Sequence, residues 1–105
     1  MSLNRAKKTA DLLTICIKAG KIIKGFDSVC GALEKGIVYC VLTASDASEK
    51  TVKEIAFQCG KRSSVMIKTE LSKEDMAGLC GKTTAVVAVI DKGFADGFAK
   101  IAQAK

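Results

Sequence analysis

Two short apolar runs constrain the fold of this 105-residue chain more than any other feature. Residues 37–43 read Ile-Val-Tyr-Cys-Val-Leu-Thr, and residues 85–90 read Ala-Val-Val-Ala-Val-Ile. Both are rich in β-branched side chains, which favour strands, and the first has the pattern of a central strand buried on both faces. Such a strand needs helices above and below it, so the sequence predicts a sheet enclosed between helices.

Amphipathic segments with helix start and stop signals fill the intervals between the strands. Residues 4–19 carry apolar side chains at helical spacing, and Gly20 ends that helix. Later helices are expected to begin at polar caps: Asp27 or Ser28, Asp46 or Ser48, and the pair Ser72 and Asp75, which resembles a capping box. With further strands at 21–24 and 65–68, the order αβαβαβαβα predicts an α/β fold with helices on both faces of the sheet.

The charge balance favours a polyanionic partner. The chain has 17 Lys and Arg against 11 Asp and Glu, which gives a formal net charge of +6 and a pI near 9.2. A small basic domain often binds RNA or DNA, although many basic surfaces serve only solubility. The basic residues are spread along the chain, which excludes a polybasic tail and is compatible with a basic face.

Composition gives no sign of a domain boundary, a metal site or an export signal. Proline is absent and no long Gly/Ser run occurs, so residues 1–105 are expected to form a single domain. The five cysteines are odd in number and widely spaced, which indicates neither a disulfide framework nor a zinc site. They are expected to be core residues in a reducing cytosol, and the protein is expected to be cytoplasmic with no membrane contact.

Catalytic chemistry finds no support among the residues. Gly81-Lys82-Thr83 resembles the end of a phosphate-binding loop, but the glycine required five positions earlier is Met76. The chain has no histidine, so Ser–His and Cys–His pairs cannot form. The sequence therefore predicts no enzyme, no catalytic residues, no cofactor and no small-molecule substrate. Lys82, Thr83 and Thr84 are instead expected to be exposed donors suited to phosphates or base edges.

The turn at residues 25–28, Gly-Phe-Asp-Ser, follows a basic segment at 18–24 and is the main candidate binding site. A helix that begins here presents free N–H groups and a positive dipole end to phosphate. In that interpretation Asp27 accepts from a guanine edge and Phe26 stacks on a base. The alternative is an ordinary strand-to-helix turn, in which Asp27 or Ser28 caps the helix and Phe26 packs on it as a hydrophobic staple.

Four short segments in matching order resemble one family. They are residues 18–21 with Gly25, residues 42–51, residues 72–76 with Gly81 and Lys82, and residues 91–95. From about residue 4 to residue 101 the chain resembles the kink-turn RNA-binding ribosomal proteins, the L-seven-Ae and L-thirty-e superfamily, and most closely the bacterial YlxQ-type members. The resemblance implies a three-layer α-β-α sandwich around a four-stranded mixed sheet, and non-enzymatic binding to structured RNA.

In that family the turn after the first strand lies beside the loop before the last strand. The turn has the pattern Gly-x-Asn-Glu-x-x-Lys, and its polar side chains grip the tandem sheared G·A pairs of the RNA. The matching positions here are Gly25, Asp27, Ser28 and Gly31, so only the glycine is kept. The loop before the last strand is apolar in archaeal members of the family. In this chain it is residues 82–84, which are polar, and it is one residue shorter than in those relatives. Each lost base contact removes about 1–3 kcal/mol of discrimination.

The sequence thus predicts a ribosome-associated protein that recognises kink-turn-like structured RNA, with ribosomal proteins as further partners. The expected RNA-binding residues are Lys21, Lys24, Gly25, Phe26, Asp27, Ser28, Gly31, Lys82, Thr83 and Thr84. The alternative is a protein–protein interaction module that keeps the fold but has lost specific RNA recognition. Ser28 and Gly31 motivate that alternative, because the family has contact residues at those positions.

Overall fold

The computed structural model describes residues 2–103, with side chains from residue 4 onward. Helices and strands alternate in the predicted order: α1 (Ser2–Lys18), β1 (Ile22–Lys24), α2 (Phe26–Glu34), β2 (Cys40–Thr43), α3 (Glu49–Arg62), β3 (Val65–Lys68), α4 (Lys73–Cys80), β4 (Val86–Val89) and α5 (Lys92–Gln103). None of the helices in residues 2–103 is long and apolar enough to cross a membrane.

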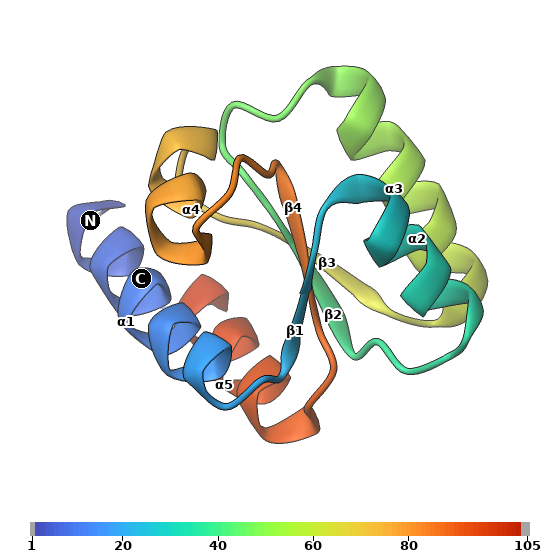
Figure 1. The fold of residues 1–105 in the computed structure, drawn as a ribbon, viewed down its shortest axis with the longest axis horizontal. Coiled ribbons are helices and arrows are strands. Elements are labelled where there is room, and N and C mark those ends of the chain that lie inside the picture. The colour runs from blue at the N-terminus through green and yellow to red at the C-terminus, as the bar shows by residue number, and fades with distance from the viewer. Residues whose placement is uncertain (1, 104–105) are drawn as a thin grey trace.

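The strands form one mixed sheet in the order β1-β4-β2-β3 (Figure 1). β4 runs antiparallel to both β1 and β2, whereas β2 and β3 are parallel neighbours connected through α3. Every residue of the two central strands, β2 and β4, is buried, which confirms the predicted central strand. The α/β class and the four-stranded mixed sheet that the resemblance implied are also confirmed.

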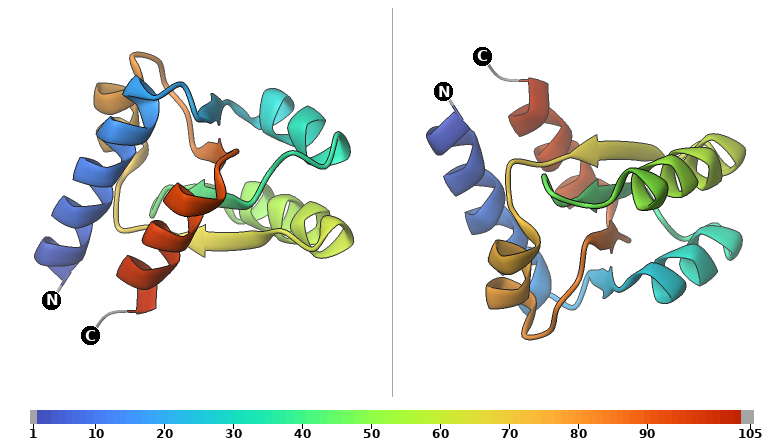
Figure 2. Two further views of the ribbon diagram at one scale, coloured as in Figure 1. Left: turned by 90° about the horizontal axis from the view of Figure 1, so that it is seen from below. Right: turned by 90° about the horizontal axis from the view of Figure 1, so that it is seen from above.

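Helices cover both faces of the sheet (Figure 2). α1, α4 and α5 lie on one face, and α2 and α3 lie on the other. Because successive strand residues point to opposite faces, β2 contributes to two separate cores. Leu42 shares one buried cluster with Phe98 of α5, and Val41 shares the other with Ile55 of α3.

Strand β2 begins later than predicted. Its ladder runs from Cys40 to Thr43, whereas the apolar run starts at Ile37. Gly36, with a φ of 73°, turns the chain out of the helical layer, and residues 37–39 carry it back to the sheet. Ile37 and Tyr39 are consequently exposed, by 43% and 50%, so an apolar run overestimates the length of the strand it contains.

The cap signals of α3 and α4 depend on residues close in sequence. Ser48 caps α3 by accepting a hydrogen bond from the N–H of Thr51 at 3.1 Å. Ser72 and Asp75 form the predicted capping box at the start of α4, with both reciprocal bonds at 3.0 Å. Asp46 does not cap α3; its carboxylate accepts from the N–H of Lys73 at 2.8 Å and supports the start of α4.

The core prediction for the cysteines holds for four of the five. Cys16, Cys40, Cys59 and Cys80 are buried, and Cys30 is half-buried. Burial raises the pKa of every thiol, to about 11 for Cys16 and about 12 for Cys40, so these groups stay neutral at physiological pH. A neutral buried thiol acts as a small apolar side chain.

Candidate nucleic-acid interface

The pairing register of β1 and β4 brings the β1–α2 turn against the α4–β4 loop. Lys24 pairs with Val87, so the following residue, Gly25, meets the start of β4. The N–H of Gly25 donates to the carbonyl oxygen of Val86 at 3.3 Å and to Thr84 Oγ1 at 3.2 Å. We call residues 24–28 the turn lip and residues 81–85 the loop lip. The resemblance implied that these segments are neighbours, and the structure confirms it.

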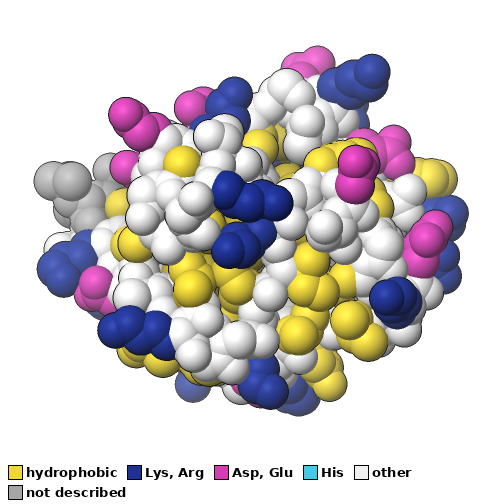
Figure 3. All heavy atoms as spheres, viewed as in Figure 1, with side chains coloured by type: hydrophobic (Ala, Val, Ile, Leu, Met, Phe, Trp, Pro, Cys, Tyr) yellow, Lys and Arg dark blue, Asp and Glu magenta, His cyan; other side chains and the backbone are white. Residues whose placement is uncertain are grey.

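Each lip carries a lysine close to the other lip. The ammonium group of Lys24 donates to the carbonyl oxygen of Cys80, the last residue of α4, at 3.0 Å. The Lys82 Nζ atom lies 3.6 Å from the position that a β-carbon on Gly25 would occupy. Figure 3 shows basic side chains gathered at the centre of this face, with apolar side chains beside them. The junction of the lips is therefore a point of concentrated positive charge.

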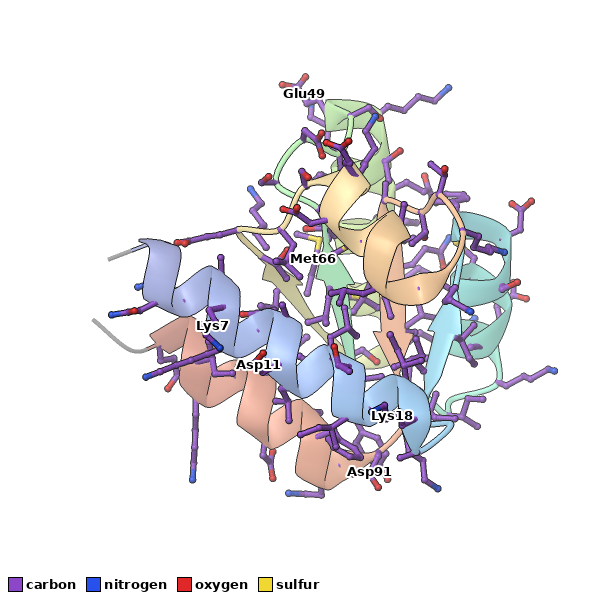
Figure 4. All side chains as sticks on the ribbon, turned by 60° about the vertical axis from the view of Figure 1, so that its left-hand side comes forward. Lys7, Asp11, Lys18, Glu49, Met66 and Asp91 are labelled. Carbon is purple, nitrogen blue, oxygen red and sulfur yellow. The ribbon has the colours of Figure 1, made fainter. Side chains whose placement is uncertain are left out.

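The two lysines at this junction form no ion pair with a carboxylate of the described side chains, although Asp27 belongs to the same turn. The ion pairs in residues 4–103 join Arg5 to Glu70 and connect lysines and carboxylates four residues apart on α1, α3 and α5. Lys7 and Asp11, 3.0 Å apart, show one such pair on the outer face of α1, away from the lips (Figure 4). Neither Lys24 nor Lys82 takes part in one, so both charges are available to an anion.

Helix α2 begins without a side-chain cap, contrary to the prediction that Asp27 or Ser28 fills this role. The N-cap is Gly25, with a φ of 95°, and the first bond of the helix joins the N–H of Val29 to the Gly25 carbonyl at 2.9 Å. The strand passes directly into the helix, so Asp27 falls within the first turn, near the positive end of the helix dipole. The first N–H groups of α2 are left open to an external acceptor.

Phe26 extends the turn lip toward α3. It is 39% exposed and lines a hollow of about 360 Å³ together with Lys50, Thr51 and Glu54 of α3. A hydrophobic staple uses the residue before the N-cap, whereas Phe26 follows it, so the staple interpretation is wrong. The exposed ring beside an open hollow is compatible with a stacked or inserted base.

Three of the predicted binding residues do not lie on the open surface of the lips. Thr84 is only 4% exposed, so the expectation of an exposed donor is wrong for this residue. The carbonyl of Lys21 accepts from the N–H of Ile90, at the opposite end of β4, about 10 Å along the strand from Lys24. Gly31 lies within α2, three residues beyond the lip, and has no side chain to offer to a ligand. The other seven predicted residues lie in or beside the two lips.

Lys50 and Thr51 share the hollow with Phe26 and are not among the residues predicted from the sequence. Both belong to the segment 42–51 that carries part of the family resemblance, so a signal was present in that segment. No local pattern predicts that these two residues lie beside Phe26. They do so because α3 packs against α2 in the folded protein.

The fold and this surface define a three-layer α-β-α protein with a basic junction between two lips at one end of its sheet. A family model matches residues 7–98, and the chain belongs to the ribosomal protein L7Ae/L30e/S12e/Gadd45 family. The match confirms the family-level resemblance, while the YlxQ-type subgroup stays a prediction. No curated protein sequence matches the chain.

Two solved structures illustrate the likeness in fold. A protein of unknown function from Bacillus halodurans C has a TM-score of 0.84 and 27% identity, covering 94% of this chain and 99% of that chain. A 15.5 kD RNA-binding protein from Giardia lamblia has a TM-score of 0.77 and 16% identity, covering 94% of this chain and 85% of that chain. At 16% identity, the second match carries the fold alone.

Proposed function

We propose that this protein is a non-enzymatic binder of structured RNA and that the turn lip and the loop lip form its binding site. The observation that carries the proposal is the 3.2 Å hydrogen bond between Gly25 and Thr84, which joins an uncapped helix N-terminus to a loop bearing an unpaired lysine. Membership of a ribosomal protein family and a net charge of +6 support RNA as the polyanion.

Recognition in this proposal divides between backbone contacts and base contacts. The free N–H groups of α2 and the ammonium groups of Lys24 and Lys82 bind phosphates, which positions the RNA. Asp27 and Ser28 are exposed in the first turn of α2 and meet base edges, with the carboxylate accepting from guanine. Phe26 stacks on a base that enters the hollow beside α3.

The RNA proposed for this site is a kink-turn or a similarly bent element, in ribosomal or other structured RNA. The hydrogen bonds of Gly25 to Thr84 and Val86 hold the two lips together as one compact site, and a compact site fits an RNA whose backbone is sharply bent. Asp27 and Ser28 replace the family's Asn and Glu, so their contacts to the G·A pairs differ in chemistry from the family pattern. Ribosome association and a cytoplasmic location are part of the same proposal.

The first experiment compares a standard kink-turn RNA with the same RNA whose tandem G·A pairs are replaced by Watson–Crick pairs, at two salt concentrations. Kink-turn recognition predicts tight binding that is lost in the replacement RNA. Weak, equal and salt-sensitive binding to both would contradict kink-turn recognition and leave general RNA binding. No salt-sensitive binding to either RNA would contradict the RNA-binding proposal itself.

A charge reversal locates the site. Lys82→Glu is expected to weaken kink-turn binding by about tenfold or more, because it replaces a phosphate partner with a repelling charge. Lys100→Glu, on the exposed surface of α5, is the matched control, since both variants lower the net charge equally. Equal effects of the two variants would assign the affinity to overall charge and contradict the proposed location.

A protein–protein interaction module is the second candidate, and exposed apolar side chains at the far edge of the sheet favour it. Tyr39 and Val65 are 50% and 56% exposed and line a hollow of about 150 Å³ with Lys92 and Asp96 of α5. Val65 belongs to β3, an edge strand, and an apolar edge is a common docking surface. Tyr39→Ser with Val65→Thr should then abolish partner binding and leave RNA affinity unchanged.

A further inference from the structure

The loop lip is held at both ends. Lys24 of β1 holds the residue just before it, and Gly25 of the turn lip holds its Thr84. At its start, the ammonium group of Lys24 holds the carbonyl oxygen of Cys80 at 3.0 Å, and cations at a helix C-terminus are favoured by the dipole. At its end, Thr84 Oγ1 accepts from the N–H of Gly25 at 3.2 Å. Between these anchors lie Gly81, Lys82 and Thr83, which are all exposed.

The hydroxyl of Thr84 has no hydrogen-bonding capacity left for a ligand. A threonine hydroxyl offers one donor and two acceptor positions. Its proton goes to the carbonyl oxygen of Val86 at 2.6 Å, and its oxygen accepts from the N–H groups of Gly25 and Val86 at 3.2 and 3.3 Å. The residue is also 4% exposed. Thr84 is therefore fully used within the protein, although its place in the loop suggested an RNA contact.

We infer that Thr84 is a positioning residue of the RNA site, which fixes the loop lip against the turn lip so that Lys82 meets the same RNA element as the start of α2. The inference rests on the proposed function. Lys24 secures the other end of the loop with one of its three ammonium donors and keeps two for phosphate. A glycine at position 81, with a φ of 80°, lets the chain leave α4 sharply between the two anchors.

This role predicts that a variant which removes no charge still lowers the salt dependence. The slope of log affinity against log salt counts the phosphates that the protein neutralises, and removing one lysine contact lowers it by about one. Loss of the Thr84 anchor displaces the loop and moves Lys82 away from its phosphate, although the lysine itself is still present. Affinity and slope then both fall, as they do when Lys82 is replaced.

The test compares the wild type with Thr84→Val, Thr84→Ser and Lys82→Gln in binding to kink-turn RNA at several salt concentrations. Valine keeps the shape of threonine without the hydroxyl, and serine keeps the hydroxyl. Thr84→Val is expected to bind about tenfold more weakly with a slope lowered by up to about one unit, Thr84→Ser to bind within about threefold of the wild type with the wild-type slope, and Lys82→Gln to lose about one unit of slope. Wild-type affinity in Thr84→Val, or weaker binding with the wild-type slope, would overturn the positioning role, because Lys82 would then still meet its phosphate.

Hydrogen exchange of the Gly25 amide provides a readout that does not depend on RNA. This N–H is shared between Thr84 Oγ1 and the carbonyl of Val86, so Thr84→Val should exchange it several-fold faster and Thr84→Ser should not. If the Gly25 amide exchanges faster in Thr84→Val but the wild type binds no RNA, the hydrogen bond from Gly25 to Thr84 is supported and the proposed function is rejected. Unchanged exchange in a folded Thr84→Val protein would reject the anchor itself, whatever the RNA affinity.

Discussion

Lys82 Nζ lies 3.6 Å from the site of a β-carbon on Gly25, an ordinary van der Waals separation, so the lips touch without crowding. The difficulty of substitution at Gly25 comes from its backbone, whose φ of 95° and ψ of 147° suit glycine. Gly25→Ala is expected to lower the free energy of unfolding by about 1–3 kcal/mol, measured by urea denaturation.

Gly31→Ala, within helix α2, is the control for the Gly25→Ala variant. It meets no atom within 4 Å and should leave stability equal or raise it by up to about 1 kcal/mol. Equal losses in both variants would contradict the strain argument.

Gly31 offers a gain-of-function test, because the family pattern has lysine at this position. A β-carbon there meets nothing within 4 Å, so a longer side chain fits without repacking. Gly31→Lys is expected to raise RNA affinity and to steepen its salt dependence by about one unit, since it adds one phosphate contact. Gly31→Ala separates this effect from helix stabilisation, and the expectation fails if both variants show the same slope.

The capping box of α4 supports the helix that leads into the loop lip. Ser72→Ala removes the acceptor of the 3.0 Å bond from the Asp75 N–H. The free energy of unfolding should fall by about 1 kcal/mol, as measured by thermal or urea unfolding. Ser72→Thr keeps a hydroxyl acceptor and should retain most of the stability. Loss in both variants alike would show that the hydroxyl is not what stabilises the helix start.

Burial of Cys40 predicts how stability changes with alkaline pH. Burial, its largest cause, and nearby ionisable groups raise the thiol pKa from 9.0 to about 12 in the folded protein. Between these values the unfolded chain loses the proton first, so the contribution of the neutral thiol is complete below pH 9 and is lost progressively toward pH 12. The wild type should therefore lose stability more steeply than Cys40→Ala, by up to about 1.4 kcal/mol per pH unit.

Urea denaturation of both proteins under reducing conditions, from pH 8 to about pH 10.5, measures that difference. All other side chains are common to both proteins, so their contributions cancel in the comparison. A difference in stability that stays constant across the range would show that the Cys40 thiol titrates alike in the folded and unfolded chains.

Local signals in the sequence predicted the structure well where the partners are neighbours along the chain. The capping box of Ser72 and Asp75 and the Ser48 cap involve residues three positions apart, and each forms as predicted. The cap of α2 was wrong because its start is set from outside the segment. Pairing of Lys24 with Val87 carries the strand up to Gly25, and the helix begins at the next residue.

The sequence by itself determined the order of helices and strands, the burial of β2 and the basic character of the surface, because periodicity, β-branching and charge are local properties. Residues of the turn lip and of the loop lip were also among the binding residues predicted from the sequence. Only the tertiary structure decided their roles: the antiparallel register of β1 and β4 places Gly25 on Thr84, which turns an expected contact into an internal anchor and leaves Lys82 exposed. This arrangement depends on the β1–β4 ladder and on the bond from the Gly25 N–H to the Thr84 hydroxyl, between residues 59 positions apart, and no local pattern in the sequence encodes such contacts.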